Sequence, residues 1–164
     1  MKQSVLATVI CFLLYGCAAA PVAPPAVPSD KKPIIAVWDL EDLSPLGIAQ
    51  MDLGNLLSAR IMETVQQAGG TVVEREKLEI ALRELNLGSS SLADTSTRLR
   101  IGRIAGARLM IFGAYQVVAD QMRLDLRIVD VETGRIIKSA ERTAAGGDIS
   151  GWLKAAEAAA KELI

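Results

Sequence analysis

Histidine is missing from this sequence of 164 residues, and cysteine occurs only at Cys11 and Cys17. Imidazole is the commonest general base and metal ligand near neutral pH, and thiolates are common nucleophiles and zinc ligands. Carboxylate pairs still allow acid–base chemistry, but no arrangement of them stands out. We therefore expect no enzyme activity, no catalytic residue, no metal site and no cofactor.

A basic excess is also lacking, and aromatic side chains are few. The chain has 18 Lys and Arg residues against 19 Asp and Glu residues, and aromatic residues make up 4% of it. Nucleic-acid-binding domains need a basic surface for the phosphates, and those that bind single strands use aromatic side chains on which bases stack. The composition therefore predicts that nucleic acid is not a partner.

The apolar run at the N-terminus, Val5 to Tyr15, is too short to cross a bilayer. A spanning helix needs about 20 residues, whereas a short apolar run after a positive charge is typical of a signal peptide. The run ends in Leu14-Tyr-Gly-Cys17, which resembles the lipobox of bacterial lipoproteins. The resemblance implies cleavage between Gly16 and Cys17 and lipidation of the Cys17 thiol. Because Ala18 rather than Asp follows, we expect an anchor in the outer membrane, on its periplasmic face.

Proline is concentrated in one segment, since five of the six prolines lie between Pro21 and Pro33. Such a segment favours polyproline II at about 3.1 Å per residue, so it predicts a tether reaching up to roughly 50 Å. The sequence thus divides into a signal peptide (1–16), a lipidated cysteine with a Pro-rich tether (17–32) and one folded domain (33–164).

Hydrophobic periodicity within 33–164 predicts an α/β domain. Strands are expected at 34–38, 71–73, 109–118, 122–128 and 135–143. Helices are expected at 49–68 and 76–85, from Asp94 to Gly106, and from Asp148 to the end. Asp94 and Asp148 are expected to cap the helices that follow them. The order β-α-β-α-α-β-β-β-α predicts a mixed sheet of about five strands, antiparallel in its second half, with helices packed on it. The segment 109–118, apolar on both faces, is expected at the centre of the sheet.

The segment from Met122 to Ile128 alternates strictly between apolar and polar residues. Its apolar residues should point into the core, which leaves Arg123, Asp125 and Arg127 on the outer face. A row of mixed charge is either an ordinary solvated face or a contact surface for a partner. We take Arg123, Asp125 and Arg127, called the strip below, as the candidate interface.

Two acidic segments are weaker candidates. Asp39, Glu41 and Asp42 follow the first expected strand, where carboxylates are well placed to bind Ca²⁺ or Mg²⁺, although a solvated loop is the favoured explanation. Glu74-Arg-Glu76 lies at a strand-to-helix junction, where helix capping and a local ion pair account for it.

Three segments together resemble the periplasmic domain of curli-secretion lipoproteins, the CsgG family. They are Thr71–Leu78, Leu92–Ala107 and Leu124–Gly134, and the likeness extends over about 33–164. Outer-membrane flagellar lipoproteins and LpoB-type activators of penicillin-binding proteins are related to this family. The resemblance implies a single domain with an anticodon-binding-like α/β fold.

One feature of the curli channel is not expected here. The channel inserts long amphipathic hairpins into the membrane, whereas the three expected strands between Leu109 and Thr143 use all of that segment. The sequence therefore predicts a non-enzymatic outer-membrane lipoprotein that acts by protein contact in envelope or surface-structure assembly or secretion, without forming the pore.

Two alternatives remain open. One is an LpoB-like activator of a peptidoglycan synthase, and the other is a small-ligand or cation sensor using the loop Asp39 to Gly47. The expected partners are the outer membrane, through the lipid, and periplasmic proteins. A homo-oligomer is left open.

Overall fold

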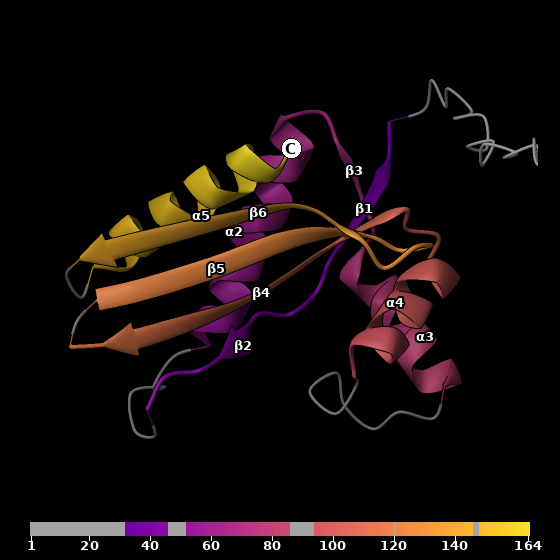
Figure 1. Ribbon diagram of the computed structural model, residues 1–164, viewed down its shortest axis with the longest axis horizontal. Coiled ribbons are helices and arrows are strands. Elements are labelled where there is room, and N and C mark those ends of the chain that lie inside the picture. The colour runs from indigo at the N-terminus through magenta and orange to yellow at the C-terminus, as the bar shows by residue number, and fades with distance from the viewer. Residues whose placement is uncertain (1–31, 46–51, 86–93, 120, 146–147) are drawn as a thin grey trace, which may run out of the picture. The chain divides into compact units, whose positions relative to one another are not determined.

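The sheet is built around β4 (Leu109–Val118), which lies at its centre as its two-sided apolar pattern predicts. The strand order is β3-β1-β4-β5-β6 (Figure 1). Both β1 (Ile34–Val37) and β3 (Thr71–Val72) belong to the parallel half, whereas β5 (Gln121–Asp130) and β6 (Ile136–Ala145) form antiparallel pairs with β4 and β5. The expected mixed α/β sheet is confirmed.

The computed structural model describes residues 32–45, 52–85, 94–119, 121–145 and 148–164. The predicted signal peptide and almost all of the predicted tether lie outside these ranges, as does the first part of the helix expected from residue 49. The division of the chain into 1–16, 17–32 and 33–164 therefore stays a prediction.

Four helices among the described residues cover the sheet in two pairs. On one face lie α2 (Leu53–Gln67) and α5 (Ile149–Leu163), and on the other lie α3 (Arg75–Glu84) and α4 (Thr95–Ile104). The first pair runs along the long strands, whereas the second lies at the β1 end of the sheet (Figure 1). Part of the second face, over β5 and β6, therefore carries no helix among the described residues.

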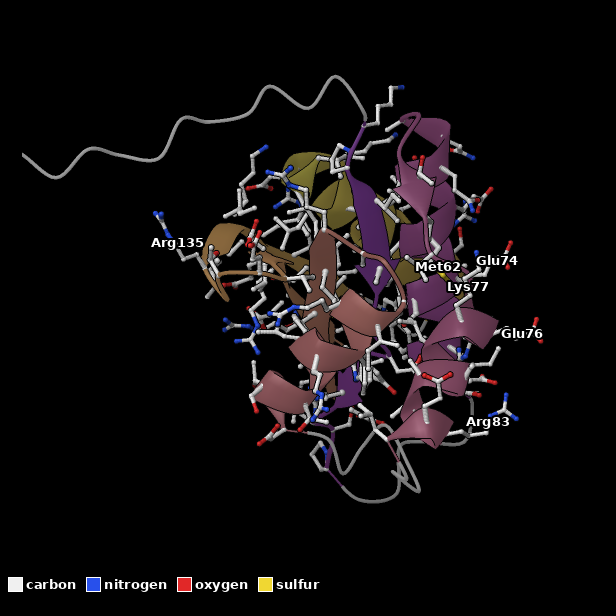
Figure 2. All side chains as sticks on the ribbon, turned by 90° about the vertical axis from the view of Figure 1, so that its right-hand side faces the viewer. Met62, Glu74, Glu76, Lys77, Arg83 and Arg135 are labelled. Carbon is white, nitrogen blue, oxygen red and sulfur yellow. The ribbon has the colours of Figure 1, made fainter. Side chains whose placement is uncertain are left out.

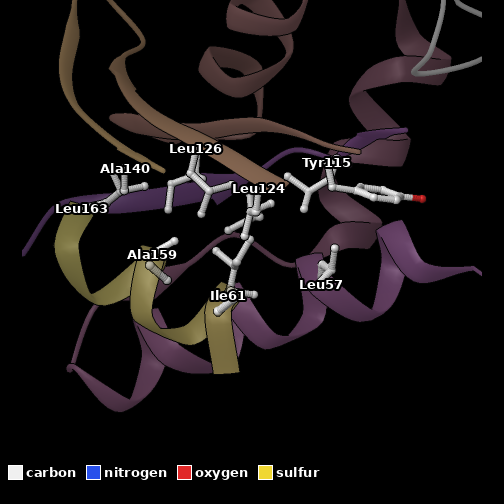
Figure 3. Packing of buried hydrophobic residues seen from close by; sticks show 14 of the residues in the cluster. Leu57, Ile61, Tyr115, Leu124, Leu126, Ala140, Ala159 and Leu163 are labelled. Carbon is white, nitrogen blue, oxygen red and sulfur yellow. The ribbon is translucent and has the colours of Figure 1, made fainter. Parts of the chain in front are cut away.

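The larger core lies between the sheet and the first helix pair. Figure 3 shows Leu57 and Ile61 of α2 and Ala159 and Leu163 of α5 directed at Leu124 of β5 and its neighbours. Burial of one such leucine or isoleucine stabilises the fold by about 1.5–3 kcal/mol. The inward face of α5 is mostly alanine, and side chains this small let the helix approach the sheet closely. Its inward residues include Ala155, Ala156, Ala159 and Ala160.

A second core fills the space beneath α3 and α4. Met110 and Phe112 of β4 point into it together with Trp38, Leu78 and Ile101. Alternate residues of β4, such as Ile111 and Tyr115, point into the first core instead. This explains why β4 has no solvated face over most of its length.

Side-chain caps define two of the helix starts as predicted. The carboxylate of Asp94 accepts a hydrogen bond from the Thr97 amide (2.8 Å), and that of Asp148 accepts one from the Ser150 amide (2.9 Å). Glu74 occupies the N-cap position of α3 but forms no side-chain cap hydrogen bond, so the capping expected there is wrong. Acidic side chains at the N-terminus of α3 still interact favourably with the helix dipole.

The structure corrects the prediction in the segment after β1. Glu41 and Asp42 form a short strand, β2 (Glu41–Asp42), that pairs in parallel with β4 at Ala114 and Tyr115. The amide of Leu43 continues this contact by donating to the Tyr115 carbonyl (2.9 Å). Two polar residues carry no periodic signal, so only the geometry of β4 reveals the strand. With β2 the sheet has six strands.

Candidate protein-contact site

The strip lies on the outer face of β5, as the alternation predicts. Arg123, Asp125 and Arg127 are exposed, whereas Met122, Leu124, Leu126 and Ile128 are buried against α2 and α5. The register places all three strip residues on the face that α3 and α4 leave uncovered. Their role as an interface stays a prediction.

Arg123 organises the carboxylates of this face. Its Nε lies 2.9 Å from Oδ2 of Asp125 and its Nη2 lies 3.0 Å from Oδ1, so the pair is bidentate. The same Nη2 lies 3.0 Å from Oε2 of Glu141 on β6. The hydrogen bond to Asp125, and then the charges of Asp125 and Glu141, raise the pKa of Arg123. Because all three side chains are about half exposed, these bonds orient the charges more than they stabilise the fold.

Glu141 is a member of this site that the sequence did not reveal. It lies directly opposite Asp125 in the β5–β6 register. Like charges opposite one another would repel, and Arg123 bridges them. The available signal was the alternation of β6, but alternation alone does not give the register between two strands.

Arg127 has different neighbours. Across the sheet it lies between Phe112 of β4 and Ser139 of β6, neither of which is charged. Its guanidinium carbon lies 5.9 Å from the centre of the Phe112 ring, within the range of a cation–π contact. The guanidinium therefore lies beside the Phe112 ring.

The three acidic residues after β1 point to separate partners. Asp39 pairs with Arg75 (Oδ2 to Nη2, 3.2 Å), and Glu41 forms an ion pair with Arg98. The carboxylate of Asp42 accepts a hydrogen bond from the Ser44 amide (2.8 Å). Within the described ranges, no three acidic side chains come together as a metal site would require. The arrangement therefore does not support the cation-sensing alternative, whose loop end at Gly47 lies outside those ranges.

Arg75 explains the Glu74-Arg-Glu76 segment better than capping does. Besides Asp39 it pairs with Glu79 (3.5 Å) one turn along α3, and it donates a hydrogen bond to Oδ1 of Asn55 on α2 (2.7 Å). Arg75 thus forms its local ion pair with Glu79 rather than within the expected segment, and its hydrogen bond to Asn55 ties α3 to α2.

Asp42, Ser44 and Tyr115 form a small polar cluster where β2 meets β4. Burial raises the pKa of Asp42, but the hydrogen bonds from Ser44 and Tyr115 lower that pKa more, and it lies below its ordinary value. Burial, and then the hydrogen bond to Asp42, raise the pKa of Tyr115 to about 12. The hydroxyl of Ser44 also accepts a hydrogen bond from the Val117 amide (3.0 Å). The cluster therefore ties β2 to β4.

Tyr115 allows a direct test of this cluster, because the other tyrosine, Tyr15, belongs to the predicted signal peptide. We expect its phenolate to form near pH 12 in the folded domain rather than near the ordinary 10. Since the folded pKa is raised, the stabilisation is complete below pH 10 and is lost as the pH rises towards 12. Ultraviolet absorbance during a pH titration measures the first effect, and denaturant melts measure the second.

The matched variant for this titration is Asp42→Asn. It removes the negative charge, so the pKa of Tyr115 should fall towards 10 while burial keeps it somewhat raised. Phenolate formation near pH 10 in the folded wild type would show that the ring is solvated.

The proposed anchor cannot be placed on the structure, because Gly16 and Cys17 lie outside the described residues. None of the described helices has the length and apolar character needed to cross a membrane.

Comparisons with known proteins place the fold. The family model described as "Curli production assembly/transport component CsgG" matches residues 25–119. No curated protein sequence matches the chain significantly.

Three solved structures share the fold at low sequence identity. The LpoB C-terminal domain from Salmonella enterica matches with a TM-score of 0.60 at 18% identity, over 71% of this chain and 87% of that one. The LpoB C-terminal domain from Escherichia coli matches with a TM-score of 0.53 at 19% identity, over 69% of this chain and 82% of that one. Lipoprotein GNA1162 from Neisseria meningitidis matches with a TM-score of 0.57 at 14% identity, over 69% of this chain and 80% of that one. At these identities the likeness concerns the fold alone.

Proposed function

The chain belongs to the CsgG family, and from that membership we propose that it is a non-enzymatic outer-membrane lipoprotein acting by protein contact. The process it serves is the assembly or secretion of an envelope or surface structure. The lipobox-like Leu14-Tyr-Gly-Cys17 and the Pro-rich segment after it support a lipid anchor at Cys17 and a spacer. The domain would then face the periplasm.

One observation carries the contact role. The sheet buries one face under α2 and α5, while the opposite face of β5 presents ordered, exposed charges. Arg123 fixes Asp125 and Glu141 in place, so the charge pattern exists before a partner arrives. Complementary charge patterns speed encounter and set the orientation of docking. A catalytic role has no comparable support among the described residues.

We further propose that the domain does not itself form a secretion pore. All ten residues of β4 pair with β5, from Leu109 with Asp130 to Val118 with Gln121. The connection from β5 to β6 consists of residues 131–135, and within it the amides of Glu132 and Thr133 donate hydrogen bonds to Asp130. The strands that would have to extend into a membrane are thus packed against α2 and α5.

A second candidate function is activation of a peptidoglycan synthase, as in LpoB-type proteins. The likeness to the LpoB C-terminal domains favours it, together with a tether that could span part of the periplasm. The two candidates differ in the partner captured. A penicillin-binding protein whose glycan polymerisation rises when this chain is added would establish the second, and capture of surface-structure components would establish the first.

The strip gives a direct test of the contact role. We expect Arg123→Glu combined with Arg127→Glu to reduce crosslinking to partners in intact envelopes by at least about fivefold, because like charges penalise docking. The Arg123→Glu change also places a third carboxylate beside Asp125 and Glu141. Because these charges repel one another, we expect the melting temperature of the variant to fall by up to about 5 °C while the domain stays folded. Crosslinking yield and a thermal melt are the two measurements.

The matched control is Arg83→Glu combined with Arg135→Glu. Both arginines are exposed and project from other parts of the domain, Arg83 from α3 and Arg135 from the turn before β6 (Figure 2). This pair changes the net charge equally and should keep every crosslink. If the strip variant also keeps them, the contact surface lies elsewhere.

A further inference from the structure

A cavity of about 380 Å³ opens beside the strip, between β2, α4 and the uncovered face of the sheet. Ile136, which is 58% exposed, gives it apolar surface, whereas Phe112 lines the cavity but is only 2% exposed. Arg98 of α4 and Arg127 of β5 both line it. The cavity thus combines apolar surface with two guanidinium groups.

Each carboxylate that lines this cavity already has a cationic partner. Glu41 is paired with Arg98, whose guanidinium carbon also lies 5.9 Å from the centre of the Trp38 ring. Asp125 and Glu141, the other carboxylates lining the cavity, are both engaged by Arg123. Arg123 does not itself line the cavity. The three carboxylates therefore already have cationic partners.

Arg127 is the group left over. Among the described residues no carboxylate forms an ion pair with it, and its one assigned contact is the Phe112 ring. Both oxygens of Asp125, the nearest acidic residue along the strand, accept hydrogen bonds from Arg123. A guanidinium has five N–H donors in a planar fork, which matches the two oxygens of a carboxylate.

We propose that this cavity binds an acidic side chain of a protein partner, together with an adjacent bulky apolar side chain. Arg127 would bind the carboxylate in the bidentate manner, and the exposed side chain of Ile136 would contact the apolar residue. A phosphate or polyphosphate fits less well, because Glu41, Asp125 and Glu141 surround the cavity and repel a multiply charged anion more strongly than a single carboxylate. A cation fits less well because those carboxylates already have partners.

This inference rests on the proposed function, since the cavity shares Asp125 and Arg127 with the strip. It goes beyond that proposal by naming what the partner must present. The strip orients a partner through charge, whereas the cavity selects a Glu or Asp next to a large apolar residue.

The test is a titration of the isotope-labelled mature domain, followed by nuclear magnetic resonance. The two probes are the dipeptides N-acetyl-Leu-Glu-amide and N-acetyl-Leu-Gln-amide, which have nearly the same shape and differ in charge. We expect the Glu probe to cause saturable shifts at Gly113, Arg127 and Ser139, with a Kd on the order of 1 mM. The Gln probe should bind at least about fivefold more weakly, because it cannot form the charged bidentate pair.

Variants complete the test. Arg127→Ala should abolish the preference for the Glu probe, Arg127→Lys should retain part of it, and Arg83→Ala should leave it unchanged. Equal binding of the two probes, shifts outside the cavity, or no saturable shifts would each overturn the proposal. The failures are separable: if the probes do not bind but the strip variant loses its crosslinks, the strip is the interface and the cavity is not. If the probes bind through Arg127 and the crosslinks persist, the cavity recognises carboxylates but the envelope partner docks elsewhere.

Discussion

Replacement of Cys17 by serine is expected to move the protein from the outer-membrane fraction to the soluble periplasmic fraction. Serine cannot form the thioether to diacylglycerol, and without the lipid only the domain remains. A single acyl chain holds a protein on a membrane weakly and reversibly, whereas several chains hold it firmly. The effect should therefore be close to complete. Fractionation of envelopes followed by detection of the protein measures it.

The chain provides its own control for this prediction in Cys11. Cys11 lies within the apolar run that the signal peptide should carry away, so Cys11→Ser should remain in the outer membrane and mature normally. If the Cys17→Ser protein still fractionates with the outer membrane, the lipid is not the anchor. If Cys11→Ser is released as well, the lipobox has been misplaced.

Truncation of Leu57 should destabilise the domain more than any surface change considered above. Its side chain is fully buried between α2 and the sheet, with 0% exposed (Figure 3). A buried Leu→Ala change loses transfer free energy and leaves a cavity, so we expect Leu57→Ala to lower the free energy of unfolding by about 2–5 kcal/mol. The melting temperature should fall by roughly 10 °C or more. Urea denaturation and thermal melts measure the two quantities.

The neighbouring residue makes the comparison sharp. Leu56 lies on the same helix but is 43% exposed. Leu56→Ala removes the same atoms and favours the helix slightly, so its effect should stay within about 1 kcal/mol. Similar losses for both variants would mean that α2 is rotated relative to the arrangement described here.

The elements that the sequence predicted well are those whose pattern is set by burial alone. β4 is apolar on both faces because a core lies on each side, and β5 alternates because only one of its faces is covered. Asp94 and Asp148 were recognisable as caps, since a short acidic side chain before a periodic segment has few other uses. Helix ends were less well determined. The helix expected to run to residue 68 ends at Gln67, and Ala68 is the exposed residue after it.

Features that depend on register between distant segments were not predictable in this way. β2 exists because two polar residues reach the edge of β4, and no periodicity marks them. Glu141 joins the strip because β6 pairs with β5 in one particular register. Arg98 lies beside Glu41 and Trp38 because α4 packs over the end of β1. A single sequence indicates which face of each helix or strand is buried, but it does not indicate which residues of different elements come into contact.

One fold commonly supports unrelated activities, so the function of a domain depends on the side chains of its own site. The LpoB C-terminal domains and this chain share an architecture at 18–19% identity, which does not fix the residues of a contact surface. The strip and the cavity are features of this chain's own side chains.

The position of β4 between two cores determines how cooperatively the domain unfolds. Its alternate side chains belong to two cores that lie on opposite faces of the sheet, with Ile111 in one and Met110 in the other. Loss of either helix pair would expose one face of β4 to solvent and weaken the packing of its other face in the remaining core. The two layers should therefore melt as one cooperative unit, and a half-folded species retaining a single layer should be too unstable to accumulate.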